Sequence, residues 1–390
     1  MKILYITSHY NPFVPRTGSD QRYNLLLHAL ARIGQVDVVT FADNVVSNIA
    51  NCSVIYSKNI PFILPQGRWI KIKRLLRPFS PYSYFPINKR RAQVVNQIVE
   101  NGNYDLIVTR YIPYAFECDL MRYADRLVID VDDNPVDSWM TLSRNATSRR
   151  ASLYYKLCAS LIKGLLPDIL GKIRHAYFPN NEQLMGDNAS YLPNVPFYEI
   201  QKLDRANIVP HRLLFVGDLR YRPNYLGVEH FVEKIFPQIR SRIPDVQLHL
   251  AGRNYGEAWV AKMEREQGVR VLGFVNSLEE EYAQANVCVV PVYSGAGTNI
   301  KVLEALQAGR ACVLSEEATR GFSGTMTDGT DYCVAHTDEE FAEYVCLLLV
   351  DEKKNERIAR NGAETVCIHY SKKAFNVKVA TSLLKDYVCH

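Results

Sequence analysis

Residues Tyr293–Ala305 read YSGAGTNIKVLEA and place two glycines just before a helical pattern. The preceding run Val287–Val292 is apolar and β-branched, which predicts a buried strand, and Asn299–Ala308 predicts a helix. Gly295 and Gly297 allow the backbone to approach a ligand closely, and the first N–H groups of the helix are free to bind an anion. The stretch therefore predicts one strand–loop–helix unit of an α/β domain.

Strands and helices continue to alternate on both sides of this loop. Further strands are predicted at Leu213–Val216, Val246–Ala251, Val269–Leu272 and Ala311–Ser315, with helices between them at about 225–240, 257–267 and 278–285. This alternation indicates a parallel sheet covered on both faces, with ligands bound at the carboxyl ends of its strands.

The first half of the chain predicts a second domain of the same class. Strands are expected at Ile3–Thr7, Gln35–Phe41, Asp105–Thr109, Leu127–Val131, 176–179 and 189–192, with helices at about 20–33 and 148–173. A polar segment, 195–211, is the expected linker. We expect an N-terminal Rossmann-like domain over 1–200, a C-terminal Rossmann-like domain over 201–370 and a last helix over 371–390.

Composition points to a cytoplasmic protein. Of the 390 residues, 47% are hydrophobic and 22% are charged, which is typical of a soluble globular chain. The first apolar run is too short for a signal peptide, and no stretch approaches the ~20 apolar residues of a membrane span. The nine cysteines are scattered without a CxxC pair, so the sequence supports neither a disulfide framework nor a zinc site.

A basic segment interrupts the first half. No acidic residue occurs between Asp43 and Glu100, whereas nine cations alternate there with aromatic and aliphatic residues: Lys58, Arg68, Lys71, Lys73, Arg74, Arg77, Lys89, Arg90 and Arg91. This pattern predicts contact with an anionic membrane surface through residues 61–91. The alternative is a basic loop that meets only water or a soluble anionic acceptor.

Lys301 lies in the first turn of the helix that follows the glycine loop. A cation there opposes the helix dipole at a cost of roughly 0.3–1 kcal/mol, and a bound diphosphate would reverse the sign of that contribution. Glycine loop, helix start and Lys301 together predict phosphate binding, against the alternative of an ordinary turn with an exposed lysine. Glu304, one turn later, is either a ligand of a ribose diol or a surface acid.

A dinucleotide site is the competing interpretation of the loop. Gly295 and Gly297 begin like the GxGxxG fingerprint, and Glu316 and Glu317 lie about 20 residues later, where an acid would bind a ribose. The third glycine, however, is Ile300, and the loop does not belong to the first strand–helix unit of its domain. A dehydrogenase of this kind would bind NAD.

Nearly the whole chain resembles the retaining glycosyltransferases of GT-B fold, family 4. The landmarks are Phe215–Leu219, Pro223-Asn224, Leu250–Gly252, Val271–Val275, Pro291 and Gly295–Ala305, with Pro12, Gly18-Ser19, Arg22–Leu30 and Pro193-Asn194 in the first domain. The resemblance implies two doubly wound domains facing a central cleft, the first binding the acceptor and the second the nucleotide sugar. The last helix would cross back to the first domain.

The resemblance also implies roles for single residues. Glu304 would bind the ribose, and the backbone at Phe274 and Val275 would meet the nucleobase. The remaining donor contacts would come from the loop Gly295–Asn299 and from the first domain: Gly295, Ala296, Gly297, Thr298, Asn299, Asn224, Gly18 and Ser19. Neither a metal nor a cofactor is expected, because cationic side chains and helix ends neutralise the leaving diphosphate.

The chain departs from the family pattern at three donor positions. Ala296 stands where the motif has its first glutamate, eight residues before Glu304. The arginine usual after the first strand of this domain is Asp218, and the lysine five residues later is Pro223. We therefore expect Lys301 to bind the diphosphate, assisted by Arg220 or Arg222.

Three carboxylates end a strand of the first domain, at Asp130, Asp132 and Asp133. They would repel one another unless a cation or substrate hydroxyls intervene. We expect Asp132 or Asp133 to bind substrate hydroxyls near the reacting sugar and count both, with Lys301, as catalytic residues. The alternatives are a turn cap, a DxD-type metal site and an aspartyl phosphotransferase motif.

The predicted function is sugar transfer from a nucleotide diphosphate sugar, with retention, to a saccharide or lipid-linked saccharide. Cell-surface polysaccharide or glycoconjugate synthesis, at the inner face of the membrane, is the expected setting, and no nucleic acid is involved. A GT-B nucleotide-sugar epimerase would instead release a free nucleotide sugar. A non-catalytic accessory protein would bind nucleotide without turnover.

Overall fold

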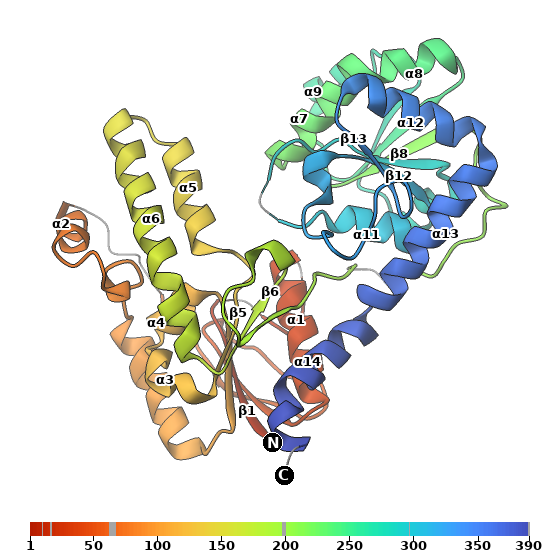
Figure 1. The fold of residues 1–390 in the computed structure, drawn as a ribbon. Coiled ribbons are helices and arrows are strands. Elements are labelled where there is room, and N and C mark those ends of the chain that lie inside the picture. The colour runs from red at the N-terminus through yellow and green to blue at the C-terminus, as the bar shows by residue number, and fades with distance from the viewer. Residues whose placement is uncertain (10, 16–17, 62–67, 197–199, 296, 389–390) are drawn as a thin grey trace. The chain divides into compact units, whose positions relative to one another are not determined.

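The computed structural model describes residues 1–390 except 10, 16–17, 62–67, 197–199, 296 and 389–390. The chain forms two compact units (Figure 1). Unit 1 comprises Met1–Pro193 and Phe375–His390, and unit 2 comprises Asn194–Ala374. Each unit contains one parallel sheet with helices packed against it, which is the doubly wound, Rossmann-like architecture that the sequence predicts.

The sheet of unit 1 has seven strands in the order β3-β2-β1-β4-β5-β6-β7. Their bounds are β1 Lys2–Thr7, β2 Gln35–Thr40, β3 Cys52–Ser57, β4 Leu106–Arg110, β5 Leu127–Asp130, β6 His175–Phe178 and β7 Ala189–Tyr191. All neighbours are parallel; Ile3 of β1, for example, is paired with Val36 on one side and Leu106 on the other. The central strands β4 and β5 are buried along their whole length because helices cover both faces of the sheet.

The helices of unit 1 include one contributed by the end of the chain. They are α1 Gly18–Ala31, α2 Arg68–Leu76, α3 Lys89–Gly102, α4 Ile112–Glu117, α5 Pro135–Arg144, α6 Arg149–Lys172 and α14 Lys372–Val388. Asn88 and Ser148 cap α3 and α6 by accepting backbone N–H groups of their first turns. In α14, Ser382 exchanges a hydrogen bond with the Tyr177 hydroxyl of β6, at 2.5 Å.

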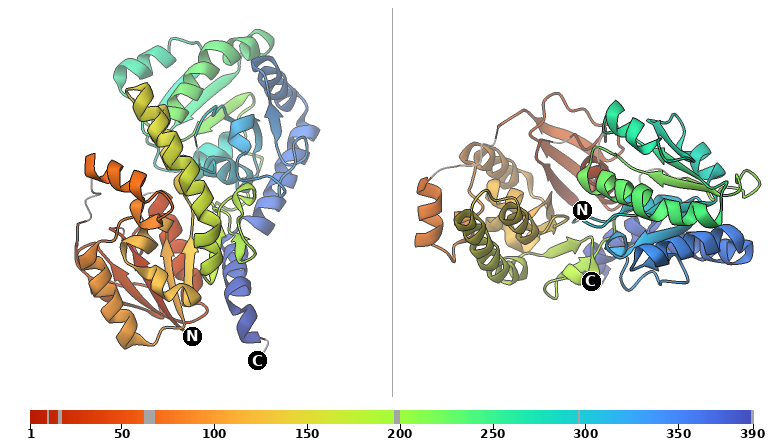
Figure 2. Two further views of the ribbon diagram at one scale, coloured as in Figure 1. Left: turned by 60° about the vertical axis from the view of Figure 1, so that its left-hand side comes forward. Right: turned by 90° about the horizontal axis from the view of Figure 1, so that it is seen from above.

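The sheet of unit 2 has six strands in the order β10-β9-β8-β11-β12-β13. Their bounds are β8 Arg212–Val216, β9 Gln247–Ala251, β10 Val269–Gly273, β11 Val287–Val290, β12 Ala311–Ser315 and β13 Cys333–Ala335. The helices are α7 Arg222–His230, α8 Phe236–Arg242, α9 Glu257–Met263, α10 Leu278–Gln284, α11 Ile300–Gln307, α12 Asp338–Val350 and α13 Glu352–His369. They lie on both faces of the sheet (Figure 2).

Two features of unit 2 differ from the sequence expectation. The helix expected over 225–240 is divided into α7, a π-helical turn at Phe231–Ile235 and α8. Pro237, at the start of α8, has no N–H to donate, and the Phe236 N–H bonds the carbonyl of Phe231 five residues back. The three-residue strand β13 was not predicted, because so short a run carries no periodic signal.

Candidate functional site

The ammonium group of Lys301 is held at the carboxyl end of the unit 2 sheet. Its Nζ atom donates hydrogen bonds to the side-chain oxygens of Asn224 on α7 and Asn299, the residue that precedes α11, both at 3.2 Å. The same atom lies 5.8 Å from the centre of the Phe215 ring. Lys301 forms no ion pair with any residue that the structure describes. Two neutral oxygens and a ring are therefore the groups in direct contact with the ammonium, and within the described structure no carboxylate lies at ion-pair distance from it.

The glycine at position 217 leaves room for this arrangement. A Cβ atom there would lie 3.0 Å from the Asn224 side-chain nitrogen and 3.2 Å from Cε of Lys301. Asn224 is itself buried, and its amide nitrogen donates to the carbonyl of Asp218 at 2.9 Å. The loop after β8, the first turn of α7 and the first turn of α11 therefore meet around one lysine.

The environment of Lys301 lowers its pKa from the ordinary 10.5 to about 8. Burial disfavours the charged ammonium and is the main cause, while the Glu304 carboxylate one turn later opposes it. A bound anion would add a countercharge in direct contact with the ammonium, in a place partly shielded from water, where Coulomb attraction is stronger than in water. The sequence indicates that the helix dipole disfavours the charge of Lys301. The structure shows that desolvation disfavours the same charge.

A segment after β12 holds the glycine loop. Arg320 donates a hydrogen bond from Nη1 to the carbonyl of Gly295, whose φ of +128° favours glycine. Asn299 donates its side-chain N–H to the carbonyl of Ala318 at 3.4 Å. A Cβ atom on Gly321 would lie 2.8 Å from Oγ1 of Thr298. Sequence reasoning missed Arg320, although β11 and β12 are neighbours and their following loops must meet.

The other predicted donor residues occupy the same edge of the unit 2 sheet. Glu304 is buried on α11, and Phe274, which is 76% exposed, follows β10 together with Val275. Arg222 is exposed at the start of α7. Gly297 is exposed, and a Cβ atom on it would meet no atom within 4 Å.

Arg220, which we expected to assist Lys301, is paired with Asp218. Its Nε and Nη2 atoms lie 3.0 and 2.7 Å from the two carboxylate oxygens, so the charge is already neutralised. Ala296 lies outside the described residues. Gly18 and Ser19 open α1, and the structure describes only their backbone.

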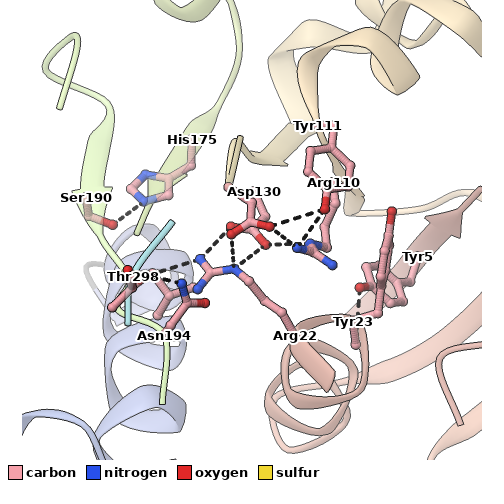
Figure 3. A network of polar contacts seen from close by, with 12 residues as sticks. Tyr5, Arg22, Tyr23, Arg110, Tyr111, Asp130, His175, Ser190, Asn194 and Thr298 are labelled. Carbon is pink, nitrogen blue, oxygen red and sulfur yellow. Dashed lines mark hydrogen bonds and ion pairs between the residues drawn. The ribbon is translucent and has the colours of Figure 1, made fainter. Parts of the chain in front are cut away.

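A buried charge network surrounds Asp130 at the end of β5 in unit 1 (Figure 3). Arg22 of α1 binds its carboxylate in a bidentate manner, at 2.8 and 2.7 Å, and Nε of Arg110 lies 3.0 Å from Oδ2. The Arg110 guanidinium also stacks 4.2 Å from the Tyr23 ring centre. Burial alone would raise the pKa of Asp130, but attraction and hydrogen bonds from Arg22 and Arg110 outweigh it and lower the pKa.

The same two arginines separate the neighbouring carboxylates. Asp132 has a positive φ of +36°, and its Oδ2 accepts hydrogen bonds from Nη2 of Arg110 and, at 3.2 Å, from the Tyr111 hydroxyl. Its Oδ1 lies 3.6 Å from Nε of Arg22. The cation that three adjacent carboxylates require is thus supplied by the chain itself.

Asp133 is placed differently from its neighbours. It is exposed, and it makes no hydrogen bond or ion pair within the described part of the chain. Partial burial and the negative charge of Asp132 raise its pKa. Of the three aspartates, Asp133 has the most acceptor capacity left for a ligand. The described residues contain no group of three or more His, Cys, Asp and Glu side chains arranged to hold a metal ion.

Two cations of the basic segment pack against the protein, although we expected the segment to face a membrane or solvent. Arg91 is only 3% exposed; it forms an ion pair with Glu117 and lies 4.4 Å from the Phe41 ring centre. Arg74 lies 4.7 Å from the Trp139 ring centre and donates to the Tyr154 hydroxyl at 3.1 Å. The aromatic and polar partners of Arg74 and Arg91 are distant in sequence, so the sequence alone did not indicate these packing contacts. Among the described residues, no helix combines the length and the apolar character needed to cross a membrane.

Comparison with known proteins gives a family match in unit 2 and one relative along most of the chain. Residues 210–351 match the family described as Glycosyl transferases group 1. The uncharacterized 44.6 kDa protein in the cps region of Klebsiella pneumoniae is 22% identical over 315 residues, which are 78% of this chain and 79% of that protein.

Solved structures share the whole fold. Sucrose-phosphate synthase from Thermosynechococcus elongatus aligns over 100% of both chains, with a TM-score of 0.66 and 17% identity. HepE from Anabaena, solved in complex with UDP, aligns over 98% of this chain and 99% of its own, with a TM-score of 0.62 and 15% identity. This chain therefore has the GT-B architecture, and its second unit carries a group 1 glycosyl transferase domain.

Proposed function

We propose that this chain is a retaining glycosyltransferase of family 4, which moves a hexosyl group from a nucleotide diphosphate sugar to a saccharide or lipid-linked saccharide. The observation that carries this proposal is the partly buried ammonium of Lys301, which is bound by Asn224 and Asn299 and forms no ion pair in the described structure. It lies at the first turn of α11, where backbone N–H groups and the helix dipole also favour a phosphate.

The proposed reaction depends on stabilising the leaving diphosphate. The bond between the anomeric carbon and the β-phosphate oxygen breaks, and the negative charge that develops on that oxygen meets Lys301 and the N–H groups at the start of α11. The acceptor hydroxyl forms the new bond from the same face of the sugar and passes its proton to the leaving phosphate. In this scheme Asp133 binds a substrate hydroxyl, Glu304 binds the ribose, and no metal is required.

The relatives support a nucleotide-sugar donor and a role in polysaccharide synthesis. HepE was solved with UDP bound, and the Klebsiella relative belongs to a cps region. We place the reaction in the cytoplasm, at the inner face of the cell membrane. The segment that would contact the membrane exposes Lys73, Leu76, Arg77 and Phe79, with Leu76 and Phe79 exposed by 76% and 77%.

Thermal-shift measurements with UDP, GDP, ADP and their sugars test the proposal. We expect at least one nucleotide diphosphate to raise the melting temperature, and Lys301→Ala to abolish that shift while far-UV circular dichroism stays unchanged. Release of nucleotide diphosphate in the presence of an acceptor then separates a transferase from an accessory protein. If none of the nucleotides binds, or if Lys301→Ala retains full activity, the proposal is wrong.

A further inference from the structure

Arg320 is a second cation at the glycine loop. It follows the 3-10 turn Glu316–Thr319 after β12, and its guanidinium reaches back to the carbonyl of Gly295, after β11. This contact joins the loops that follow two neighbouring parallel strands. The end of the Arg320 side chain therefore lies beside the loop whose other end leads into α11 and Lys301.

The charge of Arg320 is not neutralised. Its side chain is exposed, and no carboxylate lies within ion-pair distance of the guanidinium in the part of the chain that the structure describes. The two acids nearest to Arg320 in the sequence are Glu316 and Glu317. The Glu316 carboxylate lies 3.5 Å from Nδ1 of His336, and Glu317 is exposed to solvent. The loop residues 294–299 contain no acid.

Arg220 provides the contrast within the same unit. Both carboxylate oxygens of Asp218 bind the Arg220 guanidinium, at 2.7 and 3.0 Å, whereas Arg320 donates to the neutral backbone carbonyl of Gly295 and makes no ion pair among the described residues. A guanidinium carries five N–H donors in a planar fork that matches the paired oxygens of phosphate and carboxylate. Arg320 can therefore keep the Gly295 carbonyl and still bind an anion through its other donors.

We infer that Arg320 binds an anionic oxygen of the nucleotide sugar and so acts with Lys301 as the second cation of the donor site. This inference rests on the proposed function. Two groups of the donor have the required chemistry: the β-phosphate, and the carboxylate of a uronic acid if the transferred sugar carries one. Either group would supply the countercharge that the described part of the chain does not provide.

Three variants separate the charge of Arg320 from its hydrogen bond to Gly295. Arg320→Gln keeps an N–H donor for the carbonyl but removes the charge, and Arg320→Lys keeps the charge without the planar fork. Arg360→Ala is the matched control, because Arg360 is exposed on α13 and has no polar contact in the described structure. Dissociation constants are measured by calorimetry for inorganic pyrophosphate, UDP, UDP-glucose and UDP-glucuronate.

Loss of a charge-assisted hydrogen bond weakens binding by about tenfold or more. We expect Arg320→Gln to cause such a loss, Arg320→Lys to lose less and Arg360→Ala to bind like the wild type. An equal loss for pyrophosphate, UDP and both sugars assigns Arg320 to the β-phosphate. A loss confined to UDP-glucuronate assigns it to a sugar carboxylate.

Two results overturn the inference, and they differ in what they say about the proposed function. If the wild type binds these ligands and Arg320→Gln binds them equally well, Arg320 only supports the loop and the proposed function stands. If the wild type binds none of the four ligands or the other nucleotide diphosphates, both the inference and the proposed function are wrong.

Discussion

The Nζ atom of Lys301 lies 3.2 Å from the side-chain oxygen of Asn224, and this pair joins the first turns of two helices at one end of the unit 2 sheet. An asparagine oxygen orients an ammonium group without neutralising it. A carboxylate in the same place would have formed an ion pair and removed the attraction for a ligand. The neutral partner thus leaves the lysine fixed in position and still able to bind an anion.

The pKa of Lys301 predicts a specific pH dependence of ligand binding. In the free protein the ammonium loses its proton near pH 8, whereas a bound diphosphate would keep it charged. Affinity for the nucleotide diphosphate should therefore fall as the pH rises from about 7 to 9, with uptake of a proton on binding. Calorimetry in two buffers with different ionisation enthalpies measures that proton. In Lys301→Arg the side chain stays charged over this range, so the pH dependence of binding should disappear. If that pH dependence persists in the variant, it belongs to another titrating group.

As the pH rises, the contribution of Lys301 to folding stability should increase, whereas its contribution to ligand affinity should decrease. Its pKa is lower in the folded protein than the ordinary 10.5, so between about pH 8 and 10.5 the unfolded chain binds more protons. The contribution of Lys301 to the free energy of unfolding therefore rises with pH across this window. The contribution is constant below pH 8, because the lysine is then protonated in both states.

The close approach at Gly217 predicts that Gly217→Ala damages the donor site more than the fold. The added methyl group would meet Asn224 and Cε of Lys301, at 3.0 and 3.2 Å, so one of these side chains must move. We expect nucleotide diphosphate affinity to fall by about tenfold, corresponding to one lost charge-assisted hydrogen bond. Gly164→Ala on α6 is the control, because a Cβ atom there meets nothing within 4 Å. Equal affinities for the two variants would show that the site adapts to the methyl group.

Asp130 should matter for stability rather than for chemistry. Asp130→Asn removes the buried carboxylate shared by Arg22 and Arg110 and leaves only Asp132 to balance the two guanidinium groups, so we expect a loss of about 3–5 kcal/mol in the free energy of unfolding. Because the pKa of Asp130 is lowered in the folded state, its contribution is present above the ordinary value of 3.8 and is lost as the pH falls through the folded-state pKa. Urea unfolding at neutral pH measures the effect, and a loss below 1 kcal/mol would contradict it.

Asp133, in contrast to Asp130, should matter for catalysis and not for stability. Its side chain is exposed and makes no polar contact within the described structure, so Asp133→Asn should change the free energy of unfolding by no more than about 0.5 kcal/mol. If the carboxylate binds a substrate hydroxyl, the same change should lower kcat/KM for sugar transfer by about tenfold or more. Asp125→Asn is the matched control, because Asp125 is another exposed acid of unit 1 and makes no polar contact within the described structure. Unchanged kinetics in Asp133→Asn would remove this residue from the substrate site.

The sequence predicts the strands and helices around the candidate site well, since long buried strands and periodic helices carry strong local signals. It indicates Lys301 because a cation in the first turn of a helix is unfavourable without an anion. It does not indicate that Asn224 and Asn299 share this ammonium, because that contact depends on where the chain returns after β8. Likewise, nothing local shows that Arg22 and Arg110 neutralise Asp130, or that Arg91 pairs with Glu117 instead of facing solvent.

The exposed part of the basic segment predicts binding to anionic vesicles. Leu76 and Phe79 are largely exposed in the same segment as the exposed cations Lys73 and Arg77, so apolar insertion and attraction to lipid head groups would act at one place. Each cation near the surface contributes about 1 kcal/mol, so Lys73→Glu with Arg77→Glu should reduce sedimentation with phosphatidylserine vesicles at least tenfold. Leu76→Ser with Phe79→Ser should reduce it as well. Val46→Ser, a change at a residue of unit 1 that is 78% exposed outside this segment, should have no effect. If the wild-type protein stays in the supernatant at low salt, the segment does not bind membranes. The alternative, a basic surface for a soluble acceptor, would then hold.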